Sequence, residues 1–211
     1  MVATTPLTVS KAGAIVSTLA GNGEDGSVDG QGADATLNDP CDVVLASNGD
    51  LLVSDDHAIR VVTPGGAVRT LAGSGQAGFA DGQGAAACFN TPTGLALDTD
   101  GSLLVADSCN HAIRRVTMAG AVSTVVGNGG PGFANGSGAA ARFCYPNDFV
   151  VDGMGTIVVA DMGNHRLRKI VGDQVTTLAG SSEAGTADGT GAGARFDGPV
   201  CVTLTSAGAC S

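Results

Sequence analysis

Three histidines recur at similar spacing and could supply a metal centre. His57, His111 and His165 are the only histidines in this chain of 211 residues, and imidazole nitrogens are common zinc ligands. Each stands at an equivalent place in a repeated unit, however, and equivalent outer loops in a ring of units are held apart. We therefore predict no metal site and expect satisfied loop histidines, hydrogen-bonded near Asp107 or Asp161.

An acidic glycine motif could bind calcium. Asp-Gly-x-Gly begins at Asp29, Asp81 and Asp188. One carboxylate per copy is too few for a cation that takes six or more oxygen ligands, and an EF-hand loop started at Asp25 has Thr36 where a bidentate Glu is needed. We interpret the motif as a turn capped by its own side chain, and we predict no cofactor.

The pattern Gly-x-Gly-x-x-Gly could hold a dinucleotide. It begins at Gly21, Gly73 and Gly127, each time after a β-type run, as such a site requires. No amphipathic helix follows it, and no acidic residue ends a second strand at the expected distance. The motif therefore predicts a recurring turn in which glycine supplies a positive φ.

Two further residue types recur once per unit. An arginine stands at Arg60, Arg114 and Arg168. A bulky residue stands three positions before a proline, at Leu37, Phe89, Phe143 and Phe196. We expect the arginines to form a repeated structural salt bridge rather than a catalytic clamp. We expect the bulky residues to fill the gap between adjacent units.

The cysteines show no C-x-x-C spacing and no paired pattern. They stand at Cys41, Cys88, Cys109, Cys144, Cys201 and Cys210. The even count leaves disulfides open, but a chain of this length does not need them. We favour free and mostly buried thiols.

Composition limits the classes of partner. The net charge is −10, Trp is absent and Tyr145 is the single tyrosine, so the basic and aromatic surface of a nucleic-acid binder is missing. No apolar run approaches the ~20 residues that span a bilayer, and no signal peptide is evident at the start. We expect neither nucleic acid nor a membrane as partner, and the cytoplasm as location.

These residues must be positioned by a repeated element. Leu-Ala-Gly or Val-Val-Gly recurs every 52 to 54 residues, and a proline follows 21 residues later at Pro40, Pro92, Pro146 and Pro199. Within one unit, short apolar runs at 94–97, 103–106, 113–116 and 122–125 are separated by turn residues. Four short strands per unit of ~50 residues are typical of a β-propeller blade. The sequence predicts one all-β domain over residues 1–211, with blades at 40–73, 92–127 and 146–180.

The repeat also resembles a known family. The pattern Leu-Ala-Gly-x-Gly…Ala-x-Phe-x-x-Pro-x-Gly…Val-Ala-Asp-x-x-Asn-His-x-Ile-Arg, clearest at 71–114 and 125–168, is similar to the NHL repeat. The resemblance implies a propeller, usually six-bladed, that serves mostly as an interaction platform. The first unit departs from it by lacking two residues after Asp55.

The two ends of the chain resemble complementary parts of one unit. Residues 7–20 match the last two strands, and 199–211 match the first strand and the start of the second. We expect these segments to form a shared fourth blade that closes a four-bladed ring. The alternative is an arc of a larger, for example six-bladed, propeller.

No nucleophile–base pair or convergent carboxylate pair is visible, so we predict a non-enzymatic platform. The loop between the second and third strands and the inter-unit connection should share one face, with few cations among these loops. We expect that acidic face to bind a basic protein or peptide, and we expect no small-molecule ligand. Its candidate residues are Glu24, Asp25, Asp29, Asp55, Asp56, Asp81, Glu183 and Asp188, whereas Asp107 and Asp161 should be structural caps.

Two other functions stay open. Related six-bladed propellers imply a metal-dependent hydrolase or lactonase, which needs acidic residues that break the repeat and point inward. Some NHL propellers bind RNA, but the negative charge of this chain opposes that function.

Overall fold

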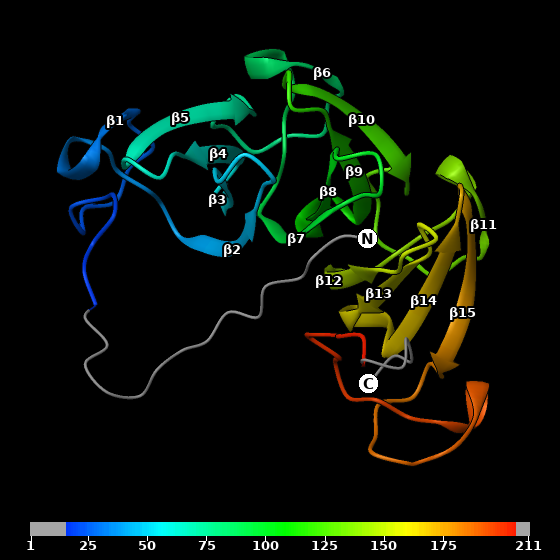
Figure 1. Cartoon of the computed structure of the whole chain (residues 1–211). Coiled ribbons are helices and arrows are strands. Elements are labelled where there is room, and N and C mark those ends of the chain that lie inside the picture. Colours follow the sequence, from blue (N-terminus) through cyan, green and yellow to red (C-terminus); the bar gives the residue numbers. More distant parts are fainter. Residues whose placement is uncertain (1–15, 206–211) are drawn as a thin grey trace.

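A computed structural model describes residues 16–205, and within them fifteen strands form three antiparallel sheets of five strands each (Figure 1). Unit one consists of β1 (Gly30–Gln31), β2 (Pro40–Leu45), β3 (Leu51–Asp55), β4 (Ala58–Val62) and β5 (Ala67–Ala72). Unit two consists of β6 (Gly82–Gln83), β7 (Pro92–Leu97), β8 (Leu103–Asp107), β9 (Ala112–Val116) and β10 (Ala121–Val126). Unit three consists of β11 (Gly136–Ser137), β12 (Pro146–Val151), β13 (Ile157–Asp161), β14 (Arg166–Val171) and β15 (Gln174–Gly180).

Short 3₁₀ helices accompany the connections and some loops. They are η1 (Gly32–Asp34), η2 (Gly84–Ala86), η3 (Ser108–Asn110), η4 (Gly138–Ala140), η5 (Met162–Asn164) and η6 (Gly191–Gly193). No helix among residues 16–205 is long and apolar enough to cross a membrane.

Glycines make the turns that the repeat predicts. Gly49 and Gly101, each after Asn or Asp in a strand connection, have φ of +90° and +82°, as tight hairpin turns require. Gly73, the first glycine of its Gly-x-Gly-x-x-Gly motif, has φ of +108°. A Cβ there would lie 2.6 Å from the His57 carbonyl oxygen. This motif is a close-packed turn and no helix follows it.

Each sheet has one strand more than the four predicted. The order is β6-β10-β9-β8-β7 in unit two, and units one and three repeat it. The connection from the preceding unit runs along the outer edge of the sheet, where Gly82 pairs with Val122. The two-residue strand therefore covers an edge that would otherwise expose unpaired backbone groups.

The three sheets lie side by side along an arc, with β2, β7 and β12 on its inner side and β5, β10 and β15 on its outer side (Figure 1). Side chains of the two innermost strands, such as Ser54 of β3 and Thr93 of β7, bond to the backbone of the inner strand of the next unit. Ser54 Oγ donates to the Thr93 carbonyl oxygen at 2.8 Å, and Thr93 Oγ1 donates to the Asn147 carbonyl oxygen at 2.6 Å. The blades of a propeller are thus linked at their inner strands.

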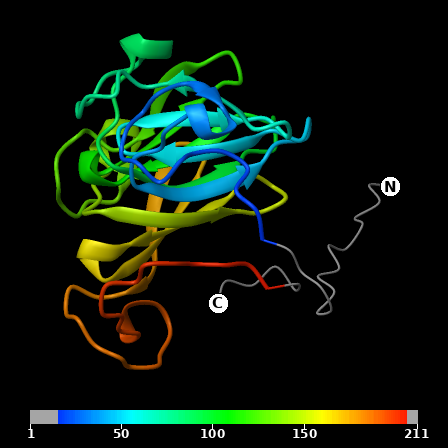
Figure 2. The same cartoon turned by 90° about the vertical axis from the view of Figure 1, so that its left-hand side faces the viewer.

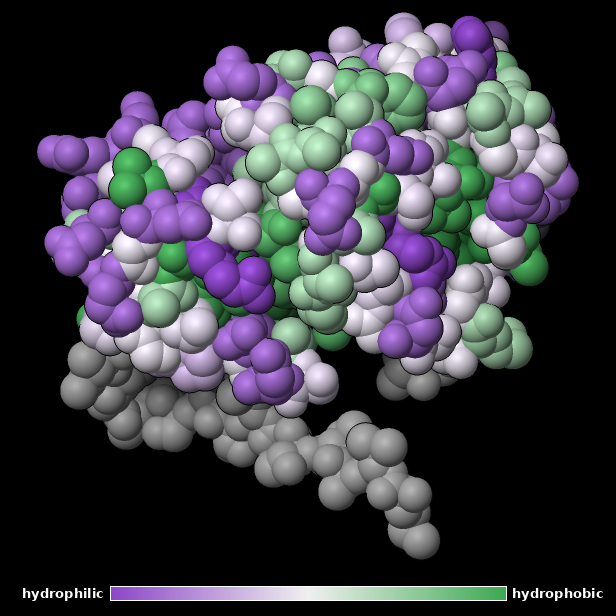
Figure 3. Space-filling view, turned by 90° about the horizontal axis from the view of Figure 1, so that it is seen from above, coloured by the Kyte–Doolittle hydropathy of each residue, from purple (hydrophilic) through white to green (hydrophobic). Residues whose placement is uncertain are grey.

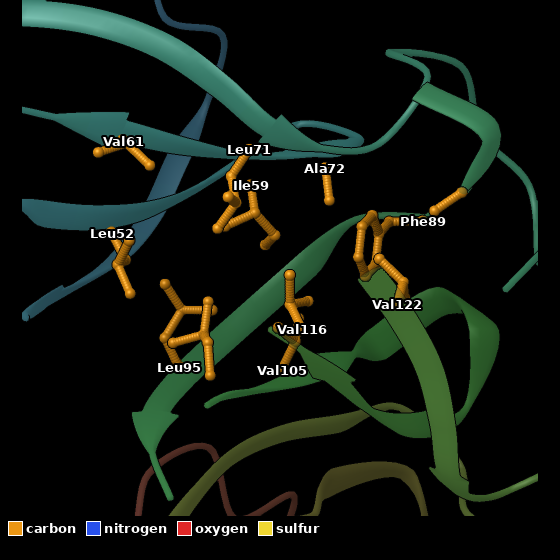
Figure 4. Close-up of a cluster of buried hydrophobic side chains, with 12 residues drawn as sticks. Leu52, Ile59, Val61, Leu71, Ala72, Phe89, Leu95, Val105, Val116 and Val122 are labelled. Atoms are coloured by element: carbon orange, nitrogen blue, oxygen red, sulfur yellow. The ribbon is translucent and has the colours of Figure 1, made fainter. Parts of the chain in front are cut away.

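Apolar clusters fill the space between units. The first cluster joins units one and two, and Phe89 is fully buried in it beside Ala72 and Val122 (Figure 4). The second joins units two and three around Phe143, also fully buried. The prediction that these phenylalanines fill the gaps between units is confirmed.

The expected fourth blade lies partly outside the described residues, since 1–15 and 206–211 are not described. Residues 16–20 form no strand, and 199–205 contain only an isolated bridge at Leu204. The latter segment nonetheless lies beside β12 (Figures 1 and 2): Asn147 Nδ2 donates to the Val200 carbonyl oxygen at 2.9 Å, and the Val202 amide donates to Asp148 Oδ2 at 3.0 Å. The strands expected at 16–19 and 200–205 are not formed, and ring closure stays a prediction.

Candidate functional site

Each unit buries one arginine between two acidic or amide side chains. In unit two, Arg114 Nη1 donates to Asp107 Oδ2 at 2.6 Å, and Nη2 donates to Asp81 Oδ1 at 2.8 Å. Asn110 Nδ2 also donates to Asp107 Oδ2, at 2.9 Å. The equivalent bonds join Arg60 to Asp55 and Asp29, and Arg168 to Asp161 and Asn135. The predicted repeat of a structural salt bridge is confirmed.

The arginines are enclosed rather than open to a ligand. The Arg114 guanidinium lies 4.7 Å from the ring centre of Phe79 and 5.3 Å from that of Phe89, within the range of cation–π contact. Its Nε is buried and has no hydrogen-bond partner among the described residues. A buried donor left unpaired costs stability, so the paired Nη groups and the rings must offset that cost.

Burial also changes the titration of these carboxyl groups. It raises the pKa of Asp107, although hydrogen bonds from Asn110 and the Asn90 amide, and the charge of Arg114, oppose the rise. Burial raises the pKa of Asp161 and of Asp55 in the same way. A buried, paired carboxylate cannot meet a partner protein, so the expectation that Asp55 belongs to the binding face is wrong.

The histidines link one unit to the next. The Thr91 amide donates to His57 Nδ1 at 3.3 Å, and the Tyr145 amide donates to His111 Nδ1 at 3.0 Å. His165 accepts the Gly198 amide in the same way. Burial lowers the pKa of His111, opposed by the charge of Asp161, which favours the neutral imidazole that can accept. Satisfied histidines near Asp107 or Asp161 were predicted, and His111 does lie near Asp161. The sequence did not show that the partner of each histidine is a backbone amide that follows the next inter-unit connection.

The other predicted acidic residues fall into two groups. Asp29 and Asp81 contact the buried arginines, and Glu183 pairs with Arg195 at 2.7 Å. Asp56 Oδ2 accepts a hydrogen bond from the side-chain Nδ2 of Asn38 at 3.0 Å, and Asp56 Oδ1 lies 3.4 Å from His57 Nε2. Glu24, Asp25 and Asp188 are exposed and have no cationic partner among residues 16–205. Glu24, Asp25 and Asp188 are therefore the predicted face residues whose charge no described cation neutralises, while Asp29, Asp81 and Glu183 are paired but at least half exposed.

Glu24 and Asp25 line a hollow together with Asp39, a residue that the sequence analysis missed. The hollow, which we call the acidic hollow, measures about 940 Å³, and its lining within residues 16–205 contains no Lys, Arg or His. Asp56 lies close by, because the Asn38 that bonds to it precedes Asp39. The acidic hollow therefore gathers carboxylates that no described cation neutralises.

The loop face also carries cations, which corrects the expectation of few. Arg142, Arg166 and Arg195 lie in or beside the loops of unit three and the segment after it. The Arg166 guanidinium covers the Phe133 ring at 4.0 Å, and Phe133 is 46% exposed. The face is therefore acidic beside unit one and mixed beside unit three.

A second hollow of about 390 Å³, which we call the central hollow, lies where the inner strands meet. Asp42 and Asp148 line it at equivalent positions of β2 and β12, whereas the equivalent residue of β7 is Gly94. Both carboxylates are engaged: Asp42 Oδ2 accepts the Leu95 amide at 2.7 Å, and Asp148 Oδ2 accepts the Val202 amide. A carboxylate at this position breaks the repeat, and that departure could have identified both residues from the sequence.

Cys41 and Cys201 also line this central hollow, and both are exposed. The hydrogen bond and charge of Asp148, followed by burial, raise the pKa of the Cys201 thiol. All five described cysteines are free, as predicted, but none is fully buried, contrary to expectation; Cys210 lies outside the described residues. Residues 16–205 contain no group of three or more His, Cys, Asp or Glu side chains placed to hold a metal ion.

Comparisons with known proteins agree with this architecture. The NHL repeat model matches residues 89–115 and 143–170. The Arabidopsis thaliana protein SUPPRESSOR OF QUENCHING 1, chloroplastic, is 40% identical over 96 residues, which cover 44% of this chain and 9% of that protein. The chain thus spans a small part of this curated relative.

Solved structures share the fold at low sequence identity. An auxiliary nutrient binding protein from Bacteroides thetaiotaomicron is similar with a TM-score of 0.54 and 15% identity, over 82% of this chain and 56% of that one. Virginiamycin B lyase from Staphylococcus aureus has a TM-score of 0.52 and 14% identity, over 84% and 57%. A gluconolactonase from Xanthomonas campestris has a TM-score of 0.50 and 19% identity, over 66% and 47%. These likenesses concern the fold alone, which is that of a β-propeller, and within this fold the chain contains NHL repeats at the two matched positions.

Proposed function

We propose that this chain is a non-enzymatic interaction platform that binds a basic protein or peptide at the acidic hollow. The observation that carries the proposal is the gathering of Glu24, Asp25 and Asp39 around one hollow whose lining has no cation. Clustered charges of one sign raise the local concentration of an oppositely charged partner. A lysine- or arginine-rich segment supplies the complementary charge.

A comparison between units supports a role other than folding for these carboxylates. In unit two the equivalent positions are Gln76, Ala77 and Thr91, all uncharged, in a unit with the same strand order. Acidic residues that serve the fold, such as Asp29 and Asp81, contact a buried arginine instead. The three carboxylates of the acidic hollow therefore fit a binding role better than a structural one.

The test replaces these residues with their unit-two equivalents. The triple variant Glu24→Gln, Asp25→Ala and Asp39→Thr should bind a fluorescent octalysine peptide at least about tenfold more weakly than the native chain, a loss of about 1.4 kcal/mol. Binding to the native chain should weaken as salt is raised, because exposed charges are screened. Fluorescence anisotropy at several salt concentrations measures both effects.

A control variant removes the same charge from the opposite face. Asp100, Asp152 and Asp173 lie in or beside strand connections there, and their change to Asn should leave octalysine affinity within about twofold. Equal losses in both variants would show that net charge alone attracts the peptide, and the proposed site would be wrong.

A hydrolase remains the second candidate because Asp42 and Asp148 break the repeat and line the central hollow. Their carboxylates accept amides of the neighbouring segments. Two carboxylates also fall short of the six or more oxygens that calcium takes. The residues present do not fit a metal, so we prefer the platform.

The cytoplasmic location expected from the sequence is part of the same proposal. The Arabidopsis relative, in contrast, is named as a chloroplastic protein. Fluorescent tagging of the full-length protein in its own cells distinguishes the two locations.

A further inference from the structure

A pocket of about 430 Å³ lies between units one and two, at the end of the sheets away from the acidic hollow. We call it the inter-unit pocket. Leu52, Val61 and Leu71 of unit one and Leu97 of unit two form its apolar floor. Figure 4 shows Leu52 and Val61 at one end of the apolar cluster and Phe89 at the other. The pocket therefore opens onto the packed core between two blades.

The pocket arises from a departure from the repeat. Val61 pairs across the sheet with Arg69, and in unit two the equivalent pair is Arg115 with Ser123. Arg115 reaches over its own strand connection, with Nη2 2.7 Å from Asp98 Oδ2. Since Val61 ends at its methyl groups, the corresponding space in unit one is left as a pocket. Arg69, which replaces the small serine, lines it.

The charged groups of the pocket are not equally available. Asp98 is neutralised by Arg115, and its other oxygen accepts the Thr99 amide at 2.6 Å. Asp50 Oδ2 accepts the Asn48 side-chain amide at 2.8 Å. Arg69 is exposed and has no hydrogen-bond or ion-pair partner within residues 16–205. The charge of Asp50 is not neutralised by the neutral Asn48 amide, but Arg69 is the cation of the pocket that has no ion pair within the described residues, and a guanidinium favours carboxylate groups.

We propose that the inter-unit pocket binds a small carboxylate with an apolar body, such as a medium-chain fatty acid. The carboxylate meets Arg69, and the apolar body lies on Leu52, Val61 and Leu97. The volume lies in the range of small-molecule sites, which combine apolar walls with a few polar groups. This proposal revises the expectation of no small-molecule ligand and does not depend on the platform function, because it uses a different part of the molecule.

The test compares three probes that share one apolar body and differ in head group. Octanoate, octanol and octylamine are titrated separately into the full chain, and binding is followed by calorimetry and by NMR of the leucine and valine methyl groups. Octanoate should bind at least about tenfold more tightly than octanol, and octylamine should bind most weakly, since only the carboxylate pairs with Arg69. Equal affinity for octanoate and octanol, or tighter binding of octylamine, would overturn the proposal.

Two variants borrow the residues of unit two. Arg69→Ser should reduce octanoate affinity to that of octanol, while the change Arg142→Ser, at another exposed arginine, should have no effect. Val61→Arg should fill the pocket and abolish binding of all three probes. If Val61→Arg does not fold, the surface variant Arg69→Ser still tests the proposal. Octanoate binding to Arg69→Ser as tight as to the native chain would contradict the role of Arg69.

Discussion

Asp81 and Asn135 occupy the same position in consecutive units and make the same contact with a buried arginine. Asp81 Oδ1 lies 2.8 Å from Arg114 Nη2, and Asn135 Oδ1 lies 3.0 Å from Arg168 Nη2. A threonine hydroxyl donates to the same oxygen in both units. The chain therefore contains its own test of what the negative charge adds.

The change Asp81→Asn should lower stability at neutral pH and leave it unchanged in acid. Burial alone raises the pKa of Asp81, but hydrogen bonds from Arg114 and Thr124 outweigh it and hold the pKa below its ordinary value of 3.8. A carboxylate with a depressed folded-state pKa stabilises the fold above its unfolded pKa, and this contribution is lost as pH falls through the folded pKa. Because the side chain is half exposed, the loss at pH 7 should be at most about 1 kcal/mol.

Urea unfolding of the native chain and of Asp81→Asn between about pH 7 and pH 2 measures this difference. The difference in free energy of unfolding between the two chains should begin to shrink as the pH falls below about 4, and it should vanish once Asp81 is protonated in the folded state. A gap that stays constant across the range would mean that the charge is not its cause.

At this scale the sequence predicted that the arginines form a repeated salt bridge, without naming the acidic partners, and it did not predict the histidine partners. Asp107 and Arg114 recur within one unit at fixed spacing, so their pairing follows from the repeat. His111 meets the Tyr145 amide across a boundary between units. That contact depends on how two units dock, and a repeat spacing contains no information about the angle between them.

The packing between blades depends on Phe143. The side chain is fully buried with residues of units two and three, so Phe143→Ala should lower the free energy of unfolding by about 3–5 kcal/mol. Chemical denaturation measures the change. Met154 is 87% exposed, and Met154→Ala should have an effect within about 0.5 kcal/mol. A loss as small for Phe143 would show that the ring does not fill the gap.

The inner strands β7 and β12 approach each other closely at Gly94. A Cβ at this position would lie 2.9 Å from the Asp148 Cα and 3.0 Å from the Asn147 carbonyl oxygen, so backbone would have to move. Gly94→Ala should therefore cost about 1–3 kcal/mol.

Gly153 is the matched glycine, because a Cβ there meets nothing within 4 Å. Gly153→Ala should be neutral or slightly stabilising, since alanine restricts the unfolded chain. Thermal unfolding compares the two, and equal melting temperatures would contradict the close approach of β7 and β12.

At the scale of elements, the long strands were predictable and the outer two-residue strands were not. The expected runs 103–106 and 113–116 correspond to β8 and β9, because apolar residues and turn glycines mark them. Gly82–Gln83 in β6 has no apolar pattern, and it is ordered by pairing with β10. Such a strand is a product of docking and leaves no local sequence signal.

The three units should differ in stability because they differ in packing. Unit two contributes to both large apolar clusters, whereas the other two contribute to one each. In a row of repeats, stability is close to a sum of each repeat and its interfaces. Hydrogen exchange followed by mass spectrometry should show the slowest exchange in β8 and β9. Faster exchange there than in β3 or β13 would contradict this picture.

Acidic residues lie at both ends of the sheets, because Glu24 and Asp25 are in an inter-unit connection and Asp100, Asp152 and Asp173 are in or beside strand connections at the opposite end. Figure 3 shows hydrophilic residues scattered over the visible surface with hydrophobic residues between them. The net charge of −10 follows from the composition, but the distribution of that charge over the surface does not. Which carboxylates a buried arginine neutralises depends on the fold, and so does the place where the rest gather.

The residue before each of the four repeated prolines, Pro40, Pro92, Pro146 and Pro199, has a left-handed backbone that is unusual for its position. Asp39, Thr91, Tyr145 and Gly198 have φ between +51° and +58°, and in the last three the amide is bonded to a histidine of the preceding unit. The backbone geometry is the same although the four residues differ: one side chain is acidic, one carries a hydroxyl group, one is aromatic, and the glycine has none. Protein engineers could therefore use these positions as a display array. Randomising them would alter the chemistry of the loop face while the scaffold beneath it keeps its shape.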